Sequence, residues 1–513
     1  MTGNKNGVDL PKKPLTQKGG KAYTMKTITV TFPEVKIKVG IEELTFDTLE
    51  SMIHEIGDRI KELVMERALR DIDDKLRINR QKGELENKGK RAKYFLVCFG
   101  SIRYKRTRYR DTKTGKARYL LDEALGIKEN QRISLKRAQI EIYLASLSPY
   151  RKVVKQTELI GGYRRSHESI RQSVIKEAER IIAHQEKELE KIRNLDYEEE
   201  EAEPQETVYV ESDSTFIKLQ KRYKGKKRRK SKKTIEVKIG IGYTDKEPRY
   251  NWGRQKSNKL KDKFVFTSVS SSGRQFMEKL SLITEKKLSL SRAKKVFFGG
   301  DGSSWIIKGI KEYFPKAAYL LCLFHLYRNI KEALSSRKEE QKIIKKLLMH
   351  NKIDQALRRI KNMFKQARDK KEKEYLNNLY TYILNNRQGI TNVITIKDKR
   401  MKRTGAIEPN IDKLVAHRMK KRGMSWSIKG ALGILKIQEI ILNREWQDWW
   451  QRQRDEKIEI NYIPPPLSAA QVLKDKAVSS FIEAQIPSLR GPDQDKPWVG
   501  VLRELTRARY FSQ

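Results

Sequence analysis

Cysteine, long apolar runs and acidic charge are all scarce in this chain. Its 513 residues include two cysteines, Cys98 and Cys322, which excludes a disulfide framework and fits a reducing compartment. No apolar run reaches the about 18 residues of a membrane span. The N-terminal sequence MTGNKNGVDLPKKP has no apolar stretch behind it, so it does not read as a signal peptide. We therefore expect a cytoplasmic protein that does not span a membrane.

The shortage of acids leaves a large positive charge. Lysine and arginine number 112 against 65 aspartates and glutamates, so the formal net charge is +47. A chain with this charge repels itself unless a polyanion neutralises it. Nucleic acid is the favoured partner, because its phosphates release counterions as Lys and Arg replace them. An anionic membrane surface is the alternative.

Composition and period divide the chain into segments. Residues 195–206 hold seven acids and no base, which is typical of a solvated linker and marks the clearest boundary. Before it we expect a disordered basic tail at 1–24 and a mainly helical DNA-binding region with a β-hairpin at 25–194. After it we expect a core at 207–334, a helical insertion at 335–400, a core helix within 401–445 and a tail at 446–513.

The hairpin is expected within residues 94–121, where apolar or aromatic residues alternate with Arg and Lys around the turn signal DTKTG at 111–115. Basic residues interleaved with Tyr104 and Tyr109 suit contact with phosphates and packing on bases or sugars. A solvated edge strand protected by its charge is the alternative. The candidate DNA-binding residues lie on the strand before the turn and are Arg103, Lys105, Arg106 and Arg108.

Two helices are expected at about 149–159 and 166–192, separated by Ile-Gly-Gly-Tyr. Ser166 is suited to cap the second helix. A helix, a glycine turn and a helix with a basic start resemble a helix-turn-helix, which makes Arg164 and Arg165 further candidates for DNA contact. An ordinary packed helix pair gives the same pattern and stays open.

The segment after the linker predicts an α/β core. Strands are expected at 207–210, 234–243, 263–268, 296–300 and 317–321, and helices at 273–290 and 303–313. Three strands, a helix, a strand, a helix and a strand form the order of a ribonuclease H-like mixed sheet. Asp213 lies just beyond the first strand and Asp301 ends the fourth, so the two carboxylates can converge.

A third acid is expected on a later helix, after the Lys-rich helical stretch at 335–385. Glu408 begins that segment, and Pro409 suits a first helical turn. Three carboxylates could hold two Mg²⁺ or Mn²⁺ ions, which catalyse displacement at phosphorus when they lie about 3.5–4 Å apart. Each acid alone could instead be a turn or helix cap, and Glu408 an acid favoured by the helix dipole.

Three further patterns have two readings each. Residues 218–233 hold eleven Lys or Arg and no acid, which favours a DNA-binding hairpin over a localisation signal. Cys322 and His325 form a Cys-x-x-His motif; without a second ligand pair we favour a structural or DNA-positioning role over zinc. The tryptophans of the tail favour core packing over stacking on a partner. The DNA-binding candidates in the basic run are Lys226, Lys227, Arg228 and Arg229, and the tryptophans of the tail are Trp446, Trp449 and Trp450. Two more DNA-binding candidates, Arg418 and Arg422, follow Glu408.

Five blocks in order resemble bacterial insertion-sequence transposases of the ISLre type, relatives of the Mutator-like transposases. The blocks read FGSIRYKRTRYRD, ESDSTF, GGDGSSW, CLFHLYRNI and TGAIEPNIDKLVAHRMKKRGMSW, with YLLDEALGI and SPYRKVVKQTELI as additional matches. The resemblance implies an oligomeric, metal-dependent enzyme of the bacterial nucleoid that binds transposon ends and target DNA. The family's three acids match Asp213, Asp301 and Glu408, and its Cys-x-x-His motif matches Cys322 and His325. Where some relatives have Asn before the third acid, this chain has Gly405.

Other functions fit the same sequence less well. A ribonuclease H-like nuclease would cut DNA without joining it, and the separate basic N-terminal half favours transposition over that reading. A non-catalytic DNA-binding descendant would not need all three acids. A basic RNA-binding protein without chemistry would keep its whole biochemistry after Asp301→Asn.

Overall fold

The computed structural model of the chain consists of two compact units. The structure describes residues 45–78, 80, 83–161, 164–194, 205–220, 234–251, 254–397, 404–421 and 423–455. The division between the units falls between Ile133 and Ser134, not in the acidic segment 195–206 where the sequence predicted it. No helix within the described ranges combines the length and apolar character that crossing a membrane requires.

The first unit pairs a long helix with a small antiparallel sheet. Its elements are α1 (Phe46–Ile78), β1 (Leu85–Val97), β2 (Gly100–Asp111), β3 (Ala117–Arg118) and α2 (Leu120–Ala124). The expected hairpin exists, but its main turn lies between Val97 and Gly100, and the predicted turn at 111–115 joins β2 to the short β3. The core of the unit forms where α1, β1, β2 and α2 meet around Leu69, Phe95 and Leu121.

The second unit is built on a five-stranded mixed sheet. Its strands are β4 (Thr207–Lys218), β5 (Thr234–Tyr243), β8 (Phe264–Val269), β9 (Lys295–Gly300) and β10 (Ala317–Leu321), in the spatial order β10-β9-β4-β5-β8. β4, β5 and β8 pair antiparallel, whereas β4, β9 and β10 run parallel. The five predicted strands are therefore confirmed. The sequence reading missed a two-stranded hairpin of β6 (Asp245–Asn251) and β7 (Arg254–Lys261).

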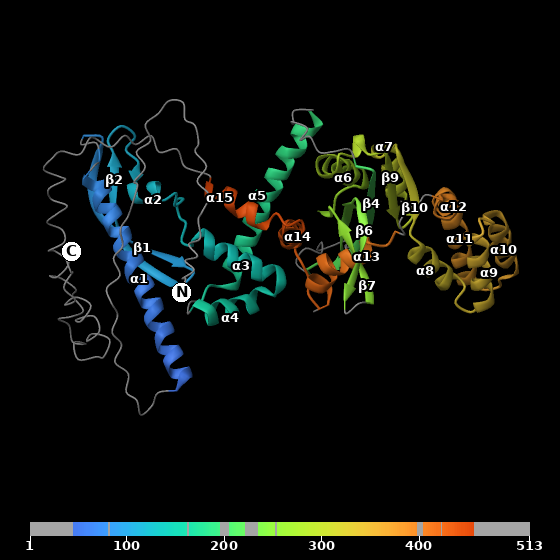
Figure 1. Ribbon diagram of the computed structural model, residues 1–513, viewed down its shortest axis with the longest axis horizontal. Helices are drawn as coiled ribbons and strands as arrows, with labels where there is room; N and C mark the ends of the chain where they lie inside the picture. Colours follow the sequence, from blue (N-terminus) through green and yellow to red (C-terminus); the bar gives the residue numbers. More distant parts are fainter. Residues whose placement is uncertain are drawn as a thin grey trace, which may run out of the picture. The chain divides into compact units, whose positions relative to one another are not determined.

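Alternation along the strands gives the sheet two apolar faces. On one face Val208, Val210 and Phe298 pack under α6 (Gly273–Leu288) and α7 (Ser304–Tyr313), and Figure 1 shows these two helices together beside the sheet. On the other face Tyr209 and Ile239 belong to a larger core. Helices α3 (Leu135–Leu147), α4 (Tyr150–Gly161), α5 (His167–Arg193), α14 (Ile428–Leu442) and α15 (Trp446–Asp455) contribute to that core, together with residues of the segment 407–426.

Helix α14 lies at the centre of this second face and is buried along most of its length. It packs against α5, α3 and β8. The three tryptophans of α15 are buried in the same core, so their prediction as core residues is confirmed. The predicted pair at 149–159 and 166–192 is also confirmed as α4 and α5, and Ser166 caps α5 by accepting a hydrogen bond from the Ser169 N–H.

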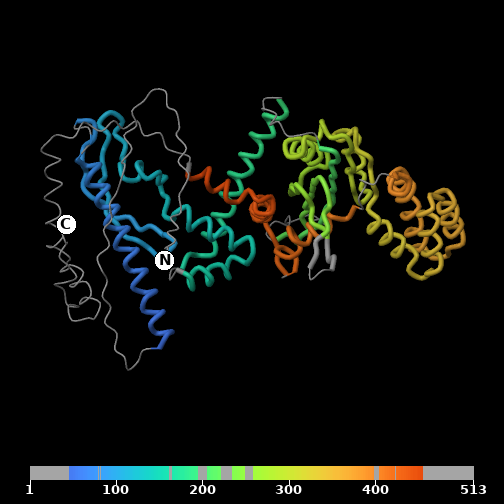
Figure 2. The backbone as a smooth tube through the Cα atoms, viewed as in Figure 1, coloured from blue at the N-terminus to red at the C-terminus, as the bar shows by residue number. Residues whose placement is uncertain are grey.

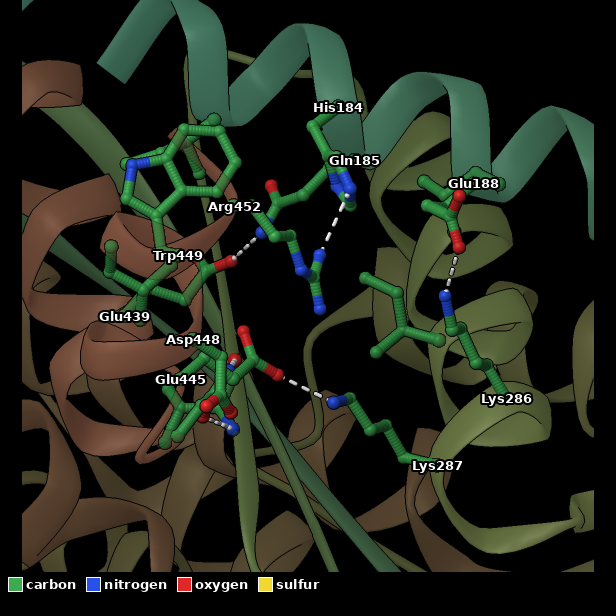
Figure 3. A pocket seen from close by; sticks show the side chains of 16 residues that line it. His184, Gln185, Glu188, Lys286, Lys287, Glu439, Glu445, Asp448, Trp449 and Arg452 are labelled. Carbon is green, nitrogen blue, oxygen red and sulfur yellow. Dashed lines mark hydrogen bonds and ion pairs between the residues drawn. The ribbon is translucent and has the colours of Figure 1, made fainter. Parts of the chain in front are cut away.

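A cluster of polar and charged side chains also connects α5 to other helices of the second unit. In Figure 3 these residues line a hollow and pair across it. His184 lies 3.0 Å from Arg452, Gln185 donates to Glu439 at 2.8 Å, and Lys286 pairs with Glu188. The helix pair is therefore part of the second unit, and contact between this pair and DNA stays a prediction.

After β10 the chain enters the predicted helical insertion. It consists of α8 (Leu323–Ala333), α9 (Lys338–Met349), α10 (Ile353–Gln366), α11 (Lys370–Asn385) and α12 (Arg387–Thr395) around a core of their own. Figure 2 shows the insertion as an ochre and orange lobe beside β10, and α12 packs directly on that strand. The chain returns to the sheet as α13 (Ile407–Ile411) and the π-helix η4 (Asp412–Lys420).

Candidate active site

Asp213 and Asp301 lie side by side because of the strand register. β4 and β9 run parallel and pair Ser212 with Gly300, so the next residue on each strand is one of the two aspartates. Both follow the alternation that turns Tyr209 and Phe297 toward the core of α14. The sequence placed Asp213 just beyond its strand, whereas β4 continues to Lys218 and pairs Asp213 with Ile239 of β5.

Glu408 reaches the same place because a buried carboxylate anchors the segment that carries it. Glu211 precedes Asp213 by two residues on β4, is 2% exposed, and accepts hydrogen bonds from the N–H groups of Gly405 (2.8 Å) and Ile407 (3.1 Å). Its other oxygen accepts from the Tyr243 hydroxyl at 2.7 Å. Gly405 has a φ of 113°, a conformation that L side chains rarely adopt. A glycine therefore suits this turn into α13.

The loop that carries Asp301 is held by the helical insertion. The Asp301 carboxylate accepts hydrogen bonds from the Ser303 N–H and hydroxyl, both at 2.8 Å. The Tyr382 hydroxyl of α11 donates to the Asp301 carbonyl oxygen at 2.7 Å. Gly302, with a φ of 92°, lies so close to Asn386 that a Cβ there would meet its amide at 2.7 Å. The insertion thus positions the second aspartate although it adds no strand to the sheet.

His325 lies among the acids. It belongs to the first turn of α8, which begins after Cys322 at the end of β10, and it is 5% exposed. Its Nε2 lies 3.3 Å from Glu408 Oε1 and 3.8 Å from Asp213 Oδ2. One ligand atom from each of these three residues falls within 4.8 Å of the other two. Cys322 is buried but is not part of this group.

The electrostatics of the group favour a bound cation. Burial and the neighbouring carboxylates of Asp301 and Glu408 raise the pKa of Asp213 to about 7, because several negative charges share a site with little water. Burial lowers the pKa of His325, which favours the neutral imidazole that binds metals. A hard divalent cation would relieve the repulsion among the carboxylates, so the residues present fit Mg²⁺ or Mn²⁺.

Two basic side chains adjoin the acids. The Lys420 ammonium of η4 donates to the Thr215 hydroxyl on β4, and burial lowers the pKa of that ammonium. Arg328 lies one turn beyond His325 on α8, and its positive charge opposes the rise in the pKa of Asp213. By contrast, Arg418 is 1% exposed and donates to the Ala145 carbonyl. The expectation that Arg418 contacts DNA is therefore wrong.

The other basic candidates divide into exposed and internally paired residues. Arg103, Lys105 and Arg108 are exposed on β2, and Arg164 is exposed before α5. Arg106 forms a partly buried ion pair with Asp122, and Arg165 with Glu141, so both have partners inside the protein, and their contact with DNA stays a prediction. The interleaved tyrosines of β2 are buried and cannot stack on bases. Lys226, Lys227, Arg228, Arg229 and Arg422 lie outside the described residues.

The sequence reading missed Glu211 and Tyr382 and gave His325 no place beside the acids. Glu211 could have been suspected, since alternation on a strand places it on the face of Asp213. Tyr382 left no signal, because it lies 81 residues from its partner, Asp301.

Comparison with known proteins places most of the chain in one family. Residues 40–453 match the model of an uncharacterised protein family, UPF0236. A UPF0236 protein of Caldanaerobacter subterraneus subsp. tengcongensis is 23% identical over 410 residues, which cover 80% of this chain and 77% of the relative. The name of that relative joins eleven locus designations of the organism. A second UPF0236 protein of the same organism, TTE2489, is 23% identical over 412 residues, covering 80% of this chain and 78% of the relative.

Among solved structures, a chain of the Drosophila P element transposase strand transfer complex matches at 11% identity with a TM-score of 0.22. That match covers 75% of this chain and 94% of the other. A score this low does not support a shared fold.

Proposed function

The chain belongs to the uncharacterised protein family UPF0236, and we propose that it is a DNA transposase that cuts DNA at the ends of its element and joins those ends to target DNA. The observation that carries the proposal is a cluster of acids: the strand register places Asp213 and Asp301 next to each other after paired residues of parallel strands, and Glu408 offers a ligand atom within 4.8 Å of one on Asp213. Carboxylates converging on one cation site suit metal-assisted displacement at phosphorus.

Three other features support this reading. The sheet, with three antiparallel strands followed by two parallel ones, agrees with our proposal of a ribonuclease H-like core that has an all-helical insertion before the third acid. The relative with eleven locus designations is what an element that copies itself within one genome would produce. The net charge of +47 suits a DNA partner.

The reaction consists of two displacements at phosphorus. In the first, a water oxygen attacks the phosphodiester at the element end, the bond to the 3′-oxygen breaks, and a 3′-hydroxyl and a 5′-phosphate result. In the second, that 3′-hydroxyl attacks a target phosphodiester, and the target 3′-oxygen leaves with the proton. One phosphodiester replaces another in this step, so no external energy source is needed.

The residues of this chain have distinct roles in the proposal. Asp213, Asp301 and Glu408 would hold Mg²⁺ or Mn²⁺, which supplies positive charge at the attacking and leaving oxygens. Glu211 is a positioning residue, because it fixes the backbone on which Glu408 is mounted. Lys420 lies where it can attract the DNA backbone to the acids.

The experiment incubates the full chain with a labelled duplex that carries the terminal repeats of its element, with Mg²⁺, Mn²⁺ or EDTA. Asp213→Ala, Asp301→Ala and Glu408→Ala are compared with wild type, and Glu374→Gln, at an exposed position of α11, is the control. Metal-dependent nicking and joining that disappear in the three alanine variants alone support the proposal. Cutting without joining indicates a nuclease, and DNA binding without any cutting overturns an enzymatic function.

A further inference from the structure

We infer that His325 supplies a nitrogen ligand to a divalent metal ion that Asp213 and Glu408 also bind. The inference rests on the proposed function, because it concerns the metal of that site, but it changes the chemistry of the site. An all-carboxylate site provides only oxygen ligands, whereas this group mixes two carboxylates with one imidazole.

The separations between the ligand atoms suit one ion. Two atoms that each lie about 2.1 Å from an octahedral ion, at right angles, are about 3.0 Å apart, and opposite ligands are about 4.2 Å apart. His325 Nε2 lies 3.3 Å from Glu408 Oε1 and 3.8 Å from Asp213 Oδ2. Small side-chain adjustments therefore bring all three atoms onto a common ion.

The position of His325 argues against a mere surface role. It is 5% exposed, and its Nε2 points into the acidic group, whereas its Nδ1 has no hydrogen-bond partner within the described residues. The Nε2 atom has the carboxylates of Glu408 and Asp213 as its neighbours, so a neutral imidazole here can share a bound cation with the two acids. The ring proton of such a ligand is then carried by Nδ1.

Asp301 differs from the other acids in its surroundings. Both of its carboxylate oxygens accept hydrogen bonds from Ser303, and it is not part of the group of three. The ligand set that includes the imidazole thus comes from β4, α8 and α13, the elements that carry Asp213, His325 and Glu408.

A nitrogen ligand predicts a preference among metals. Mg²⁺ binds oxygen ligands almost exclusively, whereas Mn²⁺ and the later first-row ions accept imidazole more readily. We expect the wild-type chain to bind Mn²⁺ more tightly than Mg²⁺, and His325→Gln, which offers an oxygen in place of nitrogen, to lose most of this preference.

The test is electron spin-echo spectroscopy of Mn²⁺ bound to the full wild-type chain without DNA. Modulation from a directly bound ¹⁴N nucleus is expected, and it should change when the histidines are labelled with ¹⁵N. In His325→Gln the nitrogen modulation should disappear and the affinity for Mn²⁺ should fall about tenfold or more, since even outer-shell partners contribute about that much. His417→Gln is the matched control, because His417 is exposed on η4.

The outcomes separate this inference from the proposed function. Tight Mn²⁺ binding without nitrogen modulation in the wild-type chain, or modulation that persists in His325→Gln, overturns the histidine ligand and leaves the carboxylate site intact. Failure of the wild-type chain to bind Mn²⁺ or Mg²⁺ at all overturns both. The wild-type spectrum decides the matter even if His325→Gln does not fold.

Discussion

Replacing Asp213 by asparagine should stabilise the metal-free protein at alkaline pH. In the folded chain the carboxyl is buried beside Asp301 and Glu408, and its pKa rises from 3.8 to about 7. A carboxyl whose pKa is raised by folding holds its proton more tightly in the folded state. The associated stability is fully present below about pH 4 and is lost as the pH rises through 7. Asparagine keeps the shape, and its oxygen can still accept the hydrogen bond from the Ser214 N–H.

The size of the effect follows from the shift. About 3 pKa units at about 1.4 kcal/mol each give about 4 kcal/mol of destabilisation of the wild-type chain once Asp213 is ionised. About 3 kcal/mol of this develops between pH 5 and pH 8.5. The advantage in unfolding free energy of Asp213→Asn over wild type should therefore grow by about 3 kcal/mol across that interval.

The assay is denaturant unfolding of both proteins in EDTA at pH 5 and pH 8.5, with Glu374→Gln as an exposed control that should differ little from wild type at either pH. Adding Mn²⁺ at pH 8.5 should stabilise the wild-type chain and not Asp213→Asn, because the variant lacks the Asp213 carboxylate that would bind the ion. An advantage that is the same at both pH values would show that the carboxyl of Asp213 is not held among other negative charges, and would refute the reasoning.

Two further predictions concern the anchor of Glu408 and the exposed strand β2. Glu211→Ala should lower the free energy of unfolding by about 3 kcal/mol, because two backbone N–H groups and a hydroxyl lose their acceptor. Glu211→Gln keeps an acceptor and should lose less than half as much in the same denaturant titration; equal losses would count against the hydrogen bonds as the cause. Replacing Arg103, Lys105 and Arg108 together by alanine should reduce the slope of log affinity for duplex DNA against log salt by about 2.7, or about 0.9 for each phosphate contact. An unchanged slope would mean that these exposed side chains do not contact DNA.

Local patterns predicted the elements of the core well. The apolar strands around Asp213 and Asp301, the amphipathic helices after them and the Ser166 cap all depend on residues close together in the sequence. The same patterns predicted the main turn of the hairpin at the wrong position. The signal at 111–115 was a real turn, but β2 is also paired on its other side with β1 through a turn at Cys98 and Phe99 that has no Asn-Gly or Asp-Gly signature.

What the sequence could not predict depends on contacts between distant segments. The basic residues of 103–108 and 164–165 looked alike, yet Arg106 and Arg165 pair with buried carboxylates, whereas Arg103, Lys105, Arg108 and Arg164 are exposed. Arg418 follows Glu408 by ten residues in a basic stretch, but it is 1% exposed, and its guanidinium donates to the Ala145 carbonyl of α3 and lies over the Trp426 ring. The two compact units divide before Ser134, because α5 packs on α14, which lies more than 230 residues later in the chain.

The two acids of β4 have different roles: Glu211 positions the backbone of the site, and Asp213 is a candidate metal ligand. Because strand residues alternate between faces, Glu211 and Asp213 point to the same side. Glu211 is 2% exposed, and its carboxylate accepts hydrogen bonds from the Tyr243 hydroxyl and from the backbone N–H groups of Gly405 and Ile407. Asp213 lies two residues farther along β4, beside Glu408, which follows the backbone segment that Glu211 holds in place. The position of Glu408 relative to Asp213 is thus set through a rigid strand, whereas Asp301 depends on Tyr382 of the insertion. Loss of the Tyr382 hydrogen bond should therefore alter the placement of Asp301 and leave the pair of Asp213 and Glu408 intact.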